Sequence, residues 1–368
     1  MLEKNLLTLG LGTLLLAAAC GSDHDPGDAD AAGAALDGSA HLMDAMSPTH
    51  EGGDDAGSTG AEHDASSRDA AAQDASQEAQ GPKVDRTNPA LHEFSLDPKA
   101  VDPSVADSLS TQYAQLDTRS APLGLLVVFL PGANNVPRDW RDHGRQLAAY
   151  GFHVLIPHYN NRWSTGDTCT GGTKTCSDDT RWEALTGEDT STAIVIPRAD
   201  SVEGRVIAML EHLSTSDPGG DWGYYLSKDK GLLYDRTIIA GISHGAASAG
   251  MYATKRAFVR NVMHSSGAAG PSSATKQTPV SAWYGFAHTE DPAYDAIVGS
   301  WDKSGLPGTP TSIDGASAPF GGSHRLITSA DSTYPHGSTC VHSSSPKDTQ
   351  GHYLFDAAWR YLYGVPGK

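Results

Sequence analysis

Short apolar runs alternate with amphipathic stretches over residues 90–368. Leu123–Leu130 is an almost continuous run of apolar residues, typical of a strand buried on both faces. Asp139–Tyr150 has helical spacing, and Gly151 follows it. Similar patterns predict further strands at Phe152–Pro157, Arg236–Ala240, Asn261–His264, Val280–Phe286 and Arg325–Thr328, and further helices at Ser201–Leu213, 246–253 and Asp356–Leu362. Strands that alternate with helices predict one α/β domain with a mostly parallel central sheet and helices on both faces.

A long segment, residues 159–199, separates the second of these strands from its helix. Loops of roughly 40 residues in a compact domain are usually functional or disordered. Cys169 and Cys176 flank a Thr-Gly-Gly-Thr-Lys-Thr turn within it, which predicts a disulfide in an oxidising compartment. The segment is interpreted either as a lid or rim over a site or as a decorated surface loop.

The beginning of the chain has the pattern of an export signal. Lys4 precedes an apolar stretch and then three alanines, which predicts a signal peptide over residues 1–19. Ala-Ala-Ala-Cys-Gly resembles a bacterial lipobox, with Ala17 where Leu is usual. The resemblance implies that Cys20 is lipidated and that the protein is anchored in the bacterial cell envelope, at the outer membrane. Ordinary cleavage near Cys20 is the alternative.

Acidic residues are concentrated between the leader and the predicted domain. The formal net charge is −18, and residues 21–80 hold 11 Asp and 3 Glu against 1 Arg, with no Phe, Trp or Tyr. Such a segment cannot bury enough apolar surface to offset its ordering entropy, so residues 20–89 are predicted to be a disordered linker. The charge excludes a basic nucleic-acid binder. The lack of another apolar stretch of roughly 20 residues excludes a protein with several membrane spans.

The motif Gly241-Ile242-Ser243-His244-Gly245 matches G-x-S-x-G. It directly follows a predicted strand and precedes a helix rich in small residues. A nucleophilic serine on a sharp strand-to-helix turn needs small neighbours two residues away on either side. We therefore predict Ser243 as a nucleophile. A glycine-rich turn without catalysis is the alternative.

A serine nucleophile needs a base, and the base needs a carboxylate that orients it. The strand Val280–Phe286 is followed by Glu290 and Asp291, and Asp291 is preferred as the acid, with Glu290 as the alternative. The strand Arg325–Thr328 is followed by His336 and His342. His336 is preferred as the base because it lies in a short, turn-rich loop before the last helix, and His342 is the alternative.

The oxyanion of a tetrahedral intermediate needs two N–H donors. His244, the residue after the nucleophile, is predicted to give one from its backbone. The second is expected from Ala133 or its neighbour Gly132, in the loop after the strand Leu123–Leu130. Gly132 would let the backbone approach closely, or would simply turn the chain.

These motifs together resemble the α/β-hydrolase superfamily, in its secreted esterase and lipase-like branch. The resemblance covers residues 120–368 and implies a Ser-Asp-His triad in that chain order. It predicts a serine hydrolase that cleaves small or polymeric carboxylic esters through an acyl-enzyme. A non-catalytic surface-binding lipoprotein on the same fold and an amidase or peptidase are the alternatives. Ile242 and the Pro-Gly of the oxyanion loop depart from common family residues and leave the substrate class open.

Two further features of the sequence bear on ligand binding. A group of aromatic residues lines either an acyl or aryl pocket or the core: Trp222, Tyr224, Tyr225, Trp283 and Tyr284. No H-E-x-x-H motif and no Cys/His pair with zinc spacing is present in the sequence, so neither a catalytic metal nor a cofactor is predicted.

Overall fold

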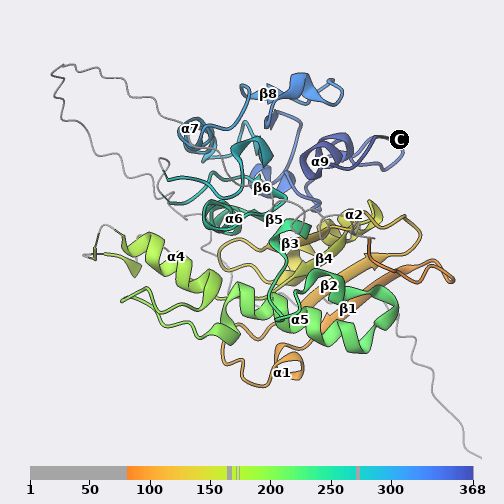
Figure 1. Cartoon of the computed structure of the whole chain (residues 1–368). Helices are drawn as coiled ribbons and strands as arrows, with labels where there is room; N and C mark the ends of the chain where they lie inside the picture. Colours follow the sequence, from red (N-terminus) through yellow and green to blue (C-terminus); the bar gives the residue numbers. More distant parts are fainter. Residues whose placement is uncertain (1–80, 164–167, 171, 174, 271–273, 368) are drawn as a thin grey trace, which may run out of the picture. The chain divides into compact units, whose positions relative to one another are not determined.

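The computed structural model describes residues 81–367, apart from 164–167, 171, 174 and 271–273 (Figure 1). The predicted signal peptide, the lipidation site Cys20 and most of the predicted linker lie outside the described residues. Among the described helices, none is both long and apolar enough to cross a bilayer.

A single nine-stranded sheet forms the centre of the described part, in the order β1-β2-β4-β3-β5-β6-β7-β9-β8. β2 runs antiparallel to both of its neighbours, β1 and β4, and the pairs from β4 through to β8 are parallel. The strands are β1 (Leu91–Leu96), β2 (Gln112–Asp117), β3 (Leu126–Leu130), β4 (His153–Ile156), β5 (Thr237–Ile242), β6 (Arg260–His264), β7 (Trp283–His288), β8 (Thr311–Ser312) and β9 (Arg325–Thr328).

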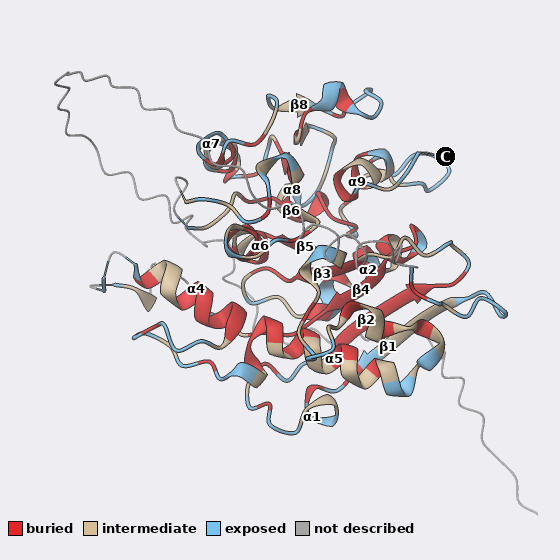
Figure 2. Ribbon diagram, in the orientation of Figure 1, coloured by how far each residue is buried: buried red, intermediate tan, exposed pale blue. Residues whose placement is uncertain are grey.

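Helices cover both faces of this sheet (Figures 1 and 2). They are α1 (Pro98–Val101), α2 (Arg141–Ala149), α4 (Cys176–Thr186), α5 (Val202–Ser216), α6 (His244–Lys255), α7 (Tyr294–Ser304), α8 (Pro335–Ser338) and α9 (Asp356–Tyr363). Alternate residues of β3 separate the two layers of core. Leu126 and Val128 pack with residues of α5, α6 and α7, whereas Val127 and Phe129 pack with α2 and α9. The expected mostly parallel central sheet with helices on both faces is confirmed.

The antiparallel pair β1 and β2 was not predicted from the sequence. β2 reads Gln-Tyr-Ala-Gln-Leu-Asp, yet every residue in it is buried. The Gln115 amide nitrogen has partners inside the protein, because it donates to Glu93 Oε2 at 2.8 Å and to the Arg141 carbonyl at 2.9 Å. Polar side chains with internal partners therefore hide this strand from a search for apolar runs.

The described end of the predicted linker contacts the folded unit. The linker was expected to reach residue 89, but Val84 packs against the core, and the Asp85 N–H donates to the Gly219 carbonyl at 2.7 Å. Arg86 Nε donates to the Thr118 carbonyl at 3.0 Å. Residues 81–89 therefore belong with the domain in the structure.

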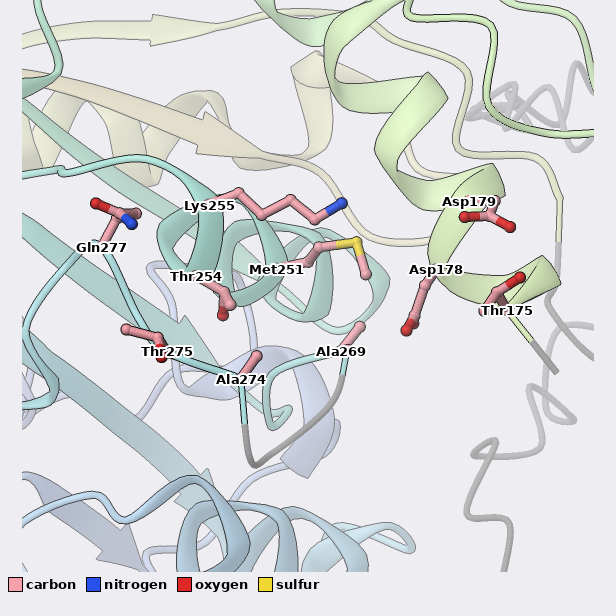
Figure 3. Close-up of a pocket in the computed structure, with 11 residues that line it drawn as sticks. Thr175, Asp178, Asp179, Met251, Thr254, Lys255, Ala269, Ala274, Thr275 and Gln277 are labelled. Carbon is pink, nitrogen blue, oxygen red and sulfur yellow. The ribbon is translucent and has the colours of Figure 1, made fainter.

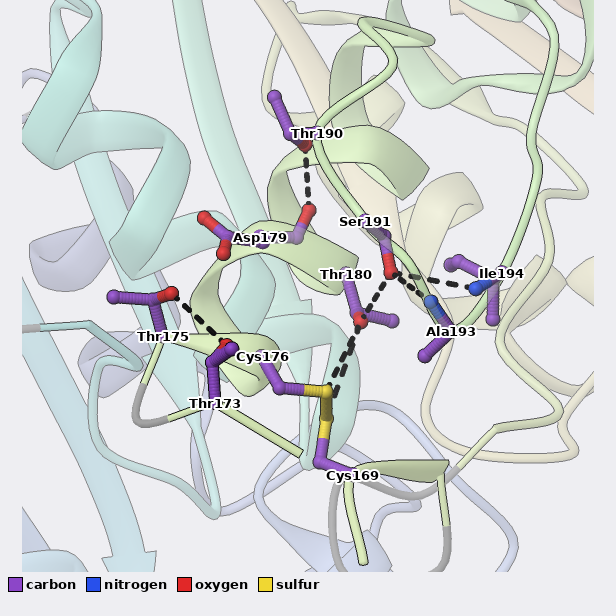
Figure 4. Close-up of a disulfide and its surroundings, with 10 residues drawn as sticks. All are labelled: Cys169, Thr173, Thr175, Cys176, Asp179, Thr180, Thr190, Ser191, Ala193 and Ile194. Carbon is purple, nitrogen blue, oxygen red and sulfur yellow. Dashed lines mark hydrogen bonds between the residues drawn. A yellow bond between two sulfur atoms is a disulfide. The ribbon is translucent and has the colours of Figure 1, made fainter. Parts of the chain in front are cut away.

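The segment 159–199 contains α4 and the predicted disulfide. Cys169 and Cys176 are joined at the beginning of α4, and Figure 4 shows Thr180 and Ser191 hydrogen-bonded beside them, with oxygens 2.8 Å apart. The Glu183 carboxylate accepts from the backbone N–H groups of Ser191 at 2.7 Å and Ile196 at 2.8 Å. The stretch that contains Ser191 and Ile196 is thus held to α4 by these hydrogen bonds.

The aromatic group from residue 222 to residue 284 serves the core rather than a pocket. Trp222 and Trp283 are fully buried, and the Trp222 ring meets His153 edge to face with centroids 4.8 Å apart. Trp283 Nε1 donates to the Thr278 carbonyl at 3.0 Å. Tyr225 and Tyr284 are also buried, and Tyr224 packs against the same core.

Candidate active site

Ser243 occupies a sharp turn between β5 and α6. Its φ of 54° and ψ of −124° lie in a region that residues with a side chain rarely adopt. A Cβ atom added at Gly245 would lie 2.1 Å from the Leu130 carbonyl oxygen, and one added at Gly241 would lie 2.6 Å from the Gly245 carbonyl carbon. Both glycines are therefore required by close backbone approach. The turn leaves Ser243 half-buried rather than enclosed in the core.

Asp291 and His336 form a hydrogen-bonded pair. Asp291 follows β7, and its Oδ2 lies 2.7 Å from His336 Nδ1. The Ala293 N–H donates to the other carboxylate oxygen at 2.9 Å, and only 1% of the Asp291 side chain is exposed. Because an ionised carboxylate only accepts, His336 donates from Nδ1, and the lone pair on its Nε2 is left available.

The structure separates the alternative acid and base from this pair. Glu290 is exposed, and its backbone N–H donates to His288 Nδ1 at 3.1 Å. His342 Nδ1 lies 2.8 Å from Ser344 Oγ, and its ring packs against Trp140 with centroids 5.9 Å apart. Burial lowers the pKa of His342. The structure therefore brings Asp291 to His336, and leaves Glu290 and His342 in other surroundings.

The end of β6 connects the serine turn to the short helix α8, which carries His336. The His264 carbonyl accepts from the Ser243 N–H at 3.0 Å. The next residue, Ser265, donates from Oγ to the His336 carbonyl at 2.7 Å, and the same oxygen lies 2.9 Å from Thr339 Oγ1. Sequence reasoning missed Ser265. Its position directly after a predicted strand was the signal that could have indicated it.

The loop after β3 lies beside the serine. A Cβ atom added at Gly132 would lie 3.4 Å from the Cβ of Ser243. In the part of the chain that the structure describes, neither the Ala133 N–H nor the His244 N–H donates a hydrogen bond. Two backbone donors without acceptors next to a serine could bind a developing oxyanion.

The side chain of His244 has a structural role. Its ring meets Trp163 edge to face with centroids 4.6 Å apart, and Arg181 Nη1 donates to the His244 carbonyl at 3.1 Å. Burial and the positive charge of Arg181 hold the pKa of His244 well below its usual range. Burial therefore favours the neutral imidazole, which packs against Trp163, and the backbone N–H of His244 remains the candidate oxyanion donor.

One group of described side chains has donors close enough to consider a metal. The donor atoms of His143, His264 and Cys340 lie within 4.8 Å of one another, and all three residues are buried. His143 Nδ1 accepts from the Val341 N–H at 3.1 Å, and the Tyr363 hydroxyl lies 3.1 Å from Nε2 of each histidine. Three of the four ring nitrogens are therefore occupied. The group joins α2, β6 and the segment that follows α8.

A cavity of about 470 Å³ lies between α4 and the C-terminal half of α6 (Figure 3). Its lining includes Asp178, Asp179, Met251 and Lys255, and none of the predicted site residues. The candidate site is therefore the group at the strand ends and not this cavity.

No family model matches the sequence, and no curated protein matches it. Among solved structures, the chain is similar to a provisionally assigned dienelactone hydrolase from Klebsiella pneumoniae, at 15% identity over 75% of this chain and 98% of that chain, with a TM-score of 0.36. It is also similar to esterase B from Lactobacillus rhamnosis with a tributyrin phosphonate, at 13% identity over 80% of this chain and 91% of that chain, with a TM-score of 0.42. These likenesses concern the fold, and the chemistry of the site is argued from its own geometry.

Proposed function

We propose that this protein is a serine hydrolase that cleaves carboxylic esters through an acyl-enzyme. Ser243 is the nucleophile, His336 the general base and Asp291 the residue that orients the base. The observation that carries the proposal is the hydrogen bond of 2.7 Å between Asp291 and His336, at the same edge of the sheet as the strained turn of Ser243.

The topology supports this arrangement. β5, β6, β7 and β9 are parallel neighbours, so their carboxyl ends meet at one edge. Ser243 follows β5, Asp291 follows β7, and His336 lies in the short helix α8, the first helix after β9. Ligands of open α/β sheets bind at this edge.

In the reaction, His336 Nε2 takes the proton of Ser243 as Oγ attacks the ester carbonyl carbon. The oxyanion that forms accepts from the N–H groups of Ala133 and His244. Asp291 stabilises the imidazolium, which then gives its proton to the departing alcohol as the C–O bond breaks. Water repeats the sequence on the acyl-enzyme: it loses a proton to His336, and Ser243 regains one when the acid leaves.

The test is labelling by a fluorophosphonate probe together with turnover of p-nitrophenyl esters. Ser243→Ala should lose labelling, and its turnover should fall by about 10⁴-fold or more. Ser281→Ala, which changes an exposed serine before β7, is the control and should behave as the wild type. Equal labelling of the wild type and Ser243→Ala would remove Ser243 from the nucleophile role. Faster turnover of matched anilides than of esters would favour an amidase.

We also propose that Cys20 carries a lipid anchor that holds the enzyme in the bacterial envelope. The support is the match of Ala17-Ala18-Ala19-Cys20 to a lipobox after an apolar leader. Metabolic labelling with an alkyne-bearing fatty acid should mark the wild type and not Cys20→Ser. Labelling of both proteins would refute the anchor at this residue.

A further inference from the structure

The loop beside Ser243, residues 131–135, is held by residues that follow β4. Asn161 Nδ2 donates to two carbonyls of this loop, that of Gly132 at 2.6 Å and that of Asn135 at 2.8 Å. The backbone carbonyl of Asn161 accepts from the Asn134 N–H at 3.2 Å. The Tyr159 hydroxyl donates to the Pro131 carbonyl at 2.9 Å.

The bond to Gly132 bears directly on the oxyanion donor. The carbonyl of Gly132 and the N–H of Ala133 belong to one planar, trans peptide group and point in opposite directions. The Gly132 carbonyl accepts from Asn161 Nδ2 and, at 3.2 Å, from the Asn135 N–H. Donors that hold this carbonyl on one side direct the Ala133 N–H to the other side. The Gly132 Cα lies beside Ser243, and the Ala133 N–H is one of the two donors without an acceptor described above.

We propose that Asn161 is a positioning residue that sets the oxyanion hole, by fixing the peptide between Gly132 and Ala133 in the orientation that binds the oxyanion. The inference rests on the proposed function, because it needs an oxyanion to form at Ser243. Asn161 itself lies behind the loop and acts through the Ala133 N–H.

The amide of Asn161 is used for its donors. The side chain is buried, with 1% of the residue exposed, and both hydrogens on Nδ2 serve carbonyls of the loop. Its Oδ1 is buried and, among the described residues, has no hydrogen-bond partner. A buried oxygen without a partner costs free energy, so the favourable part of this arrangement is the pair of hydrogen bonds that Nδ2 donates.

Asn161→Asp removes both donors at nearly constant shape and sets carboxylate oxygens against two carbonyl oxygens. We expect kcat for an ester to fall about 10²–10³-fold, as when one oxyanion donor is lost, with little change in KM. Asn161→Ser, which is neutral and can give one donor, should lose less activity. Tyr159→Phe is the matched control, because the hydroxyl that it removes bonds the carbonyl of Pro131, which belongs to the preceding peptide, and not that of Gly132.

The decisive readout is the ratio of rates for an ester and the matching thionoester. A thiocarbonyl sulfur is a weak acceptor, so loss of an oxyanion donor should slow the ester much more than the thionoester. Asn161→Asp should lower this ratio at least about tenfold, and Tyr159→Phe should leave it near the wild-type value.

An equal loss on both substrates, or an unchanged ester rate, would overturn the inference. Should Asn161→Asp fold poorly by thermal melting, the same ratio measured on Asn161→Ser decides the question. The proposed function is tested separately, by comparing the labelling of the wild type with that of Ser243→Ala. If labelling depends on Ser243 but the Asn161 variants leave the ester-to-thionoester ratio unchanged, the inference about Asn161 is refuted and the proposed function stands.

Discussion

The exchange Asp291→Asn tests the proposed catalytic pair without changing its shape. The Ala293 N–H donates to Oδ1 of residue 291, so the oxygen of an asparagine would keep that place and its amide nitrogen would face His336. An amide nitrogen only donates, so it would force Nδ1 of His336 to accept and would move the ring proton to Nε2. The nitrogen that must take the proton of Ser243 would then already carry one.

The expected loss in kcat is about 10⁴-fold, because a wrong tautomer of the base costs about that much in a serine triad. At about 1.4 kcal/mol for each factor of ten, the barrier rises by about 5 kcal/mol. The assay is turnover of a p-nitrophenyl ester under saturating substrate, with thermal melting of both proteins to show that the fold is kept.

Glu290→Gln is the matched control, because Glu290 is adjacent in sequence but exposed. Its rate should stay within about threefold of the wild type, as expected for a surface change away from the site. A larger loss from Glu290→Gln than from Asp291→Asn would reassign the acid. An Asp291→Asn enzyme within about tenfold of the wild type would refute the tautomer argument.

Three further outcomes are expected. His336→Ala should abolish ester turnover while His342→Ala, whose ring nitrogen faces Ser344, keeps most of it; the reverse ranking in the same assay would reassign the base. Gly245→Ala would place its Cβ 2.1 Å from a backbone carbonyl and should lower stability by about 3 kcal/mol, whereas Gly299→Ala, which meets no atom within 4 Å, should be neutral or stabilising; equal melting temperatures would contradict this. Burial lowers the pKa of His264 to about 3. The unfolded chain therefore binds the extra proton below about pH 6.5, so stability should fall as the pH decreases from about 6.5 to 3, by up to about 1.4 kcal/mol per pH unit. Denaturant unfolding at pH 7 and pH 5 measures the fall, and His264→Gln should reduce it.

The parallel part of the sheet could be predicted because its strands are buried on both faces and read as apolar runs. The predicted strand at Leu123–Leu130 begins at Leu126 in the structure, because Gly124 has a φ of +70° and breaks the extended run. β2 was missed because its buried glutamines have polar partners, Gln115 on β1 and α2 and Gln112 at the His158 N–H after β4. α4 was missed because cysteines and polar residues begin a helix without a clear apolar stripe. The hydrophobic pattern of a sequence indicates which residues are buried against apolar neighbours. It does not indicate polar residues that are buried with hydrogen-bond partners.

The residues of the candidate site also fall into those that the sequence pattern could indicate and those that it could not. Ser243, Asp291 and His336 could be named because each follows a recognisable strand, and chain order then suggests their roles. The sequence left Glu290 and His342 open, since neighbours in sequence differ only in where their side chains point. Asn161 and Ser265 were missed, because their importance lies in bonds to backbone groups of distant loops, which no local pattern encodes.

The segment between β4 and α5 contacts both the serine turn and the loop after β3. Its Trp163 packs on His244, its Arg181 holds the carbonyl at the start of α6, and its Asn161 holds the loop after β3. Replacing the whole segment to change the substrate preference would therefore also remove the contacts that hold the serine turn and the loop after β3. A chimera should keep residues 159–163 and 181 and vary only the tip closed by the two cysteines.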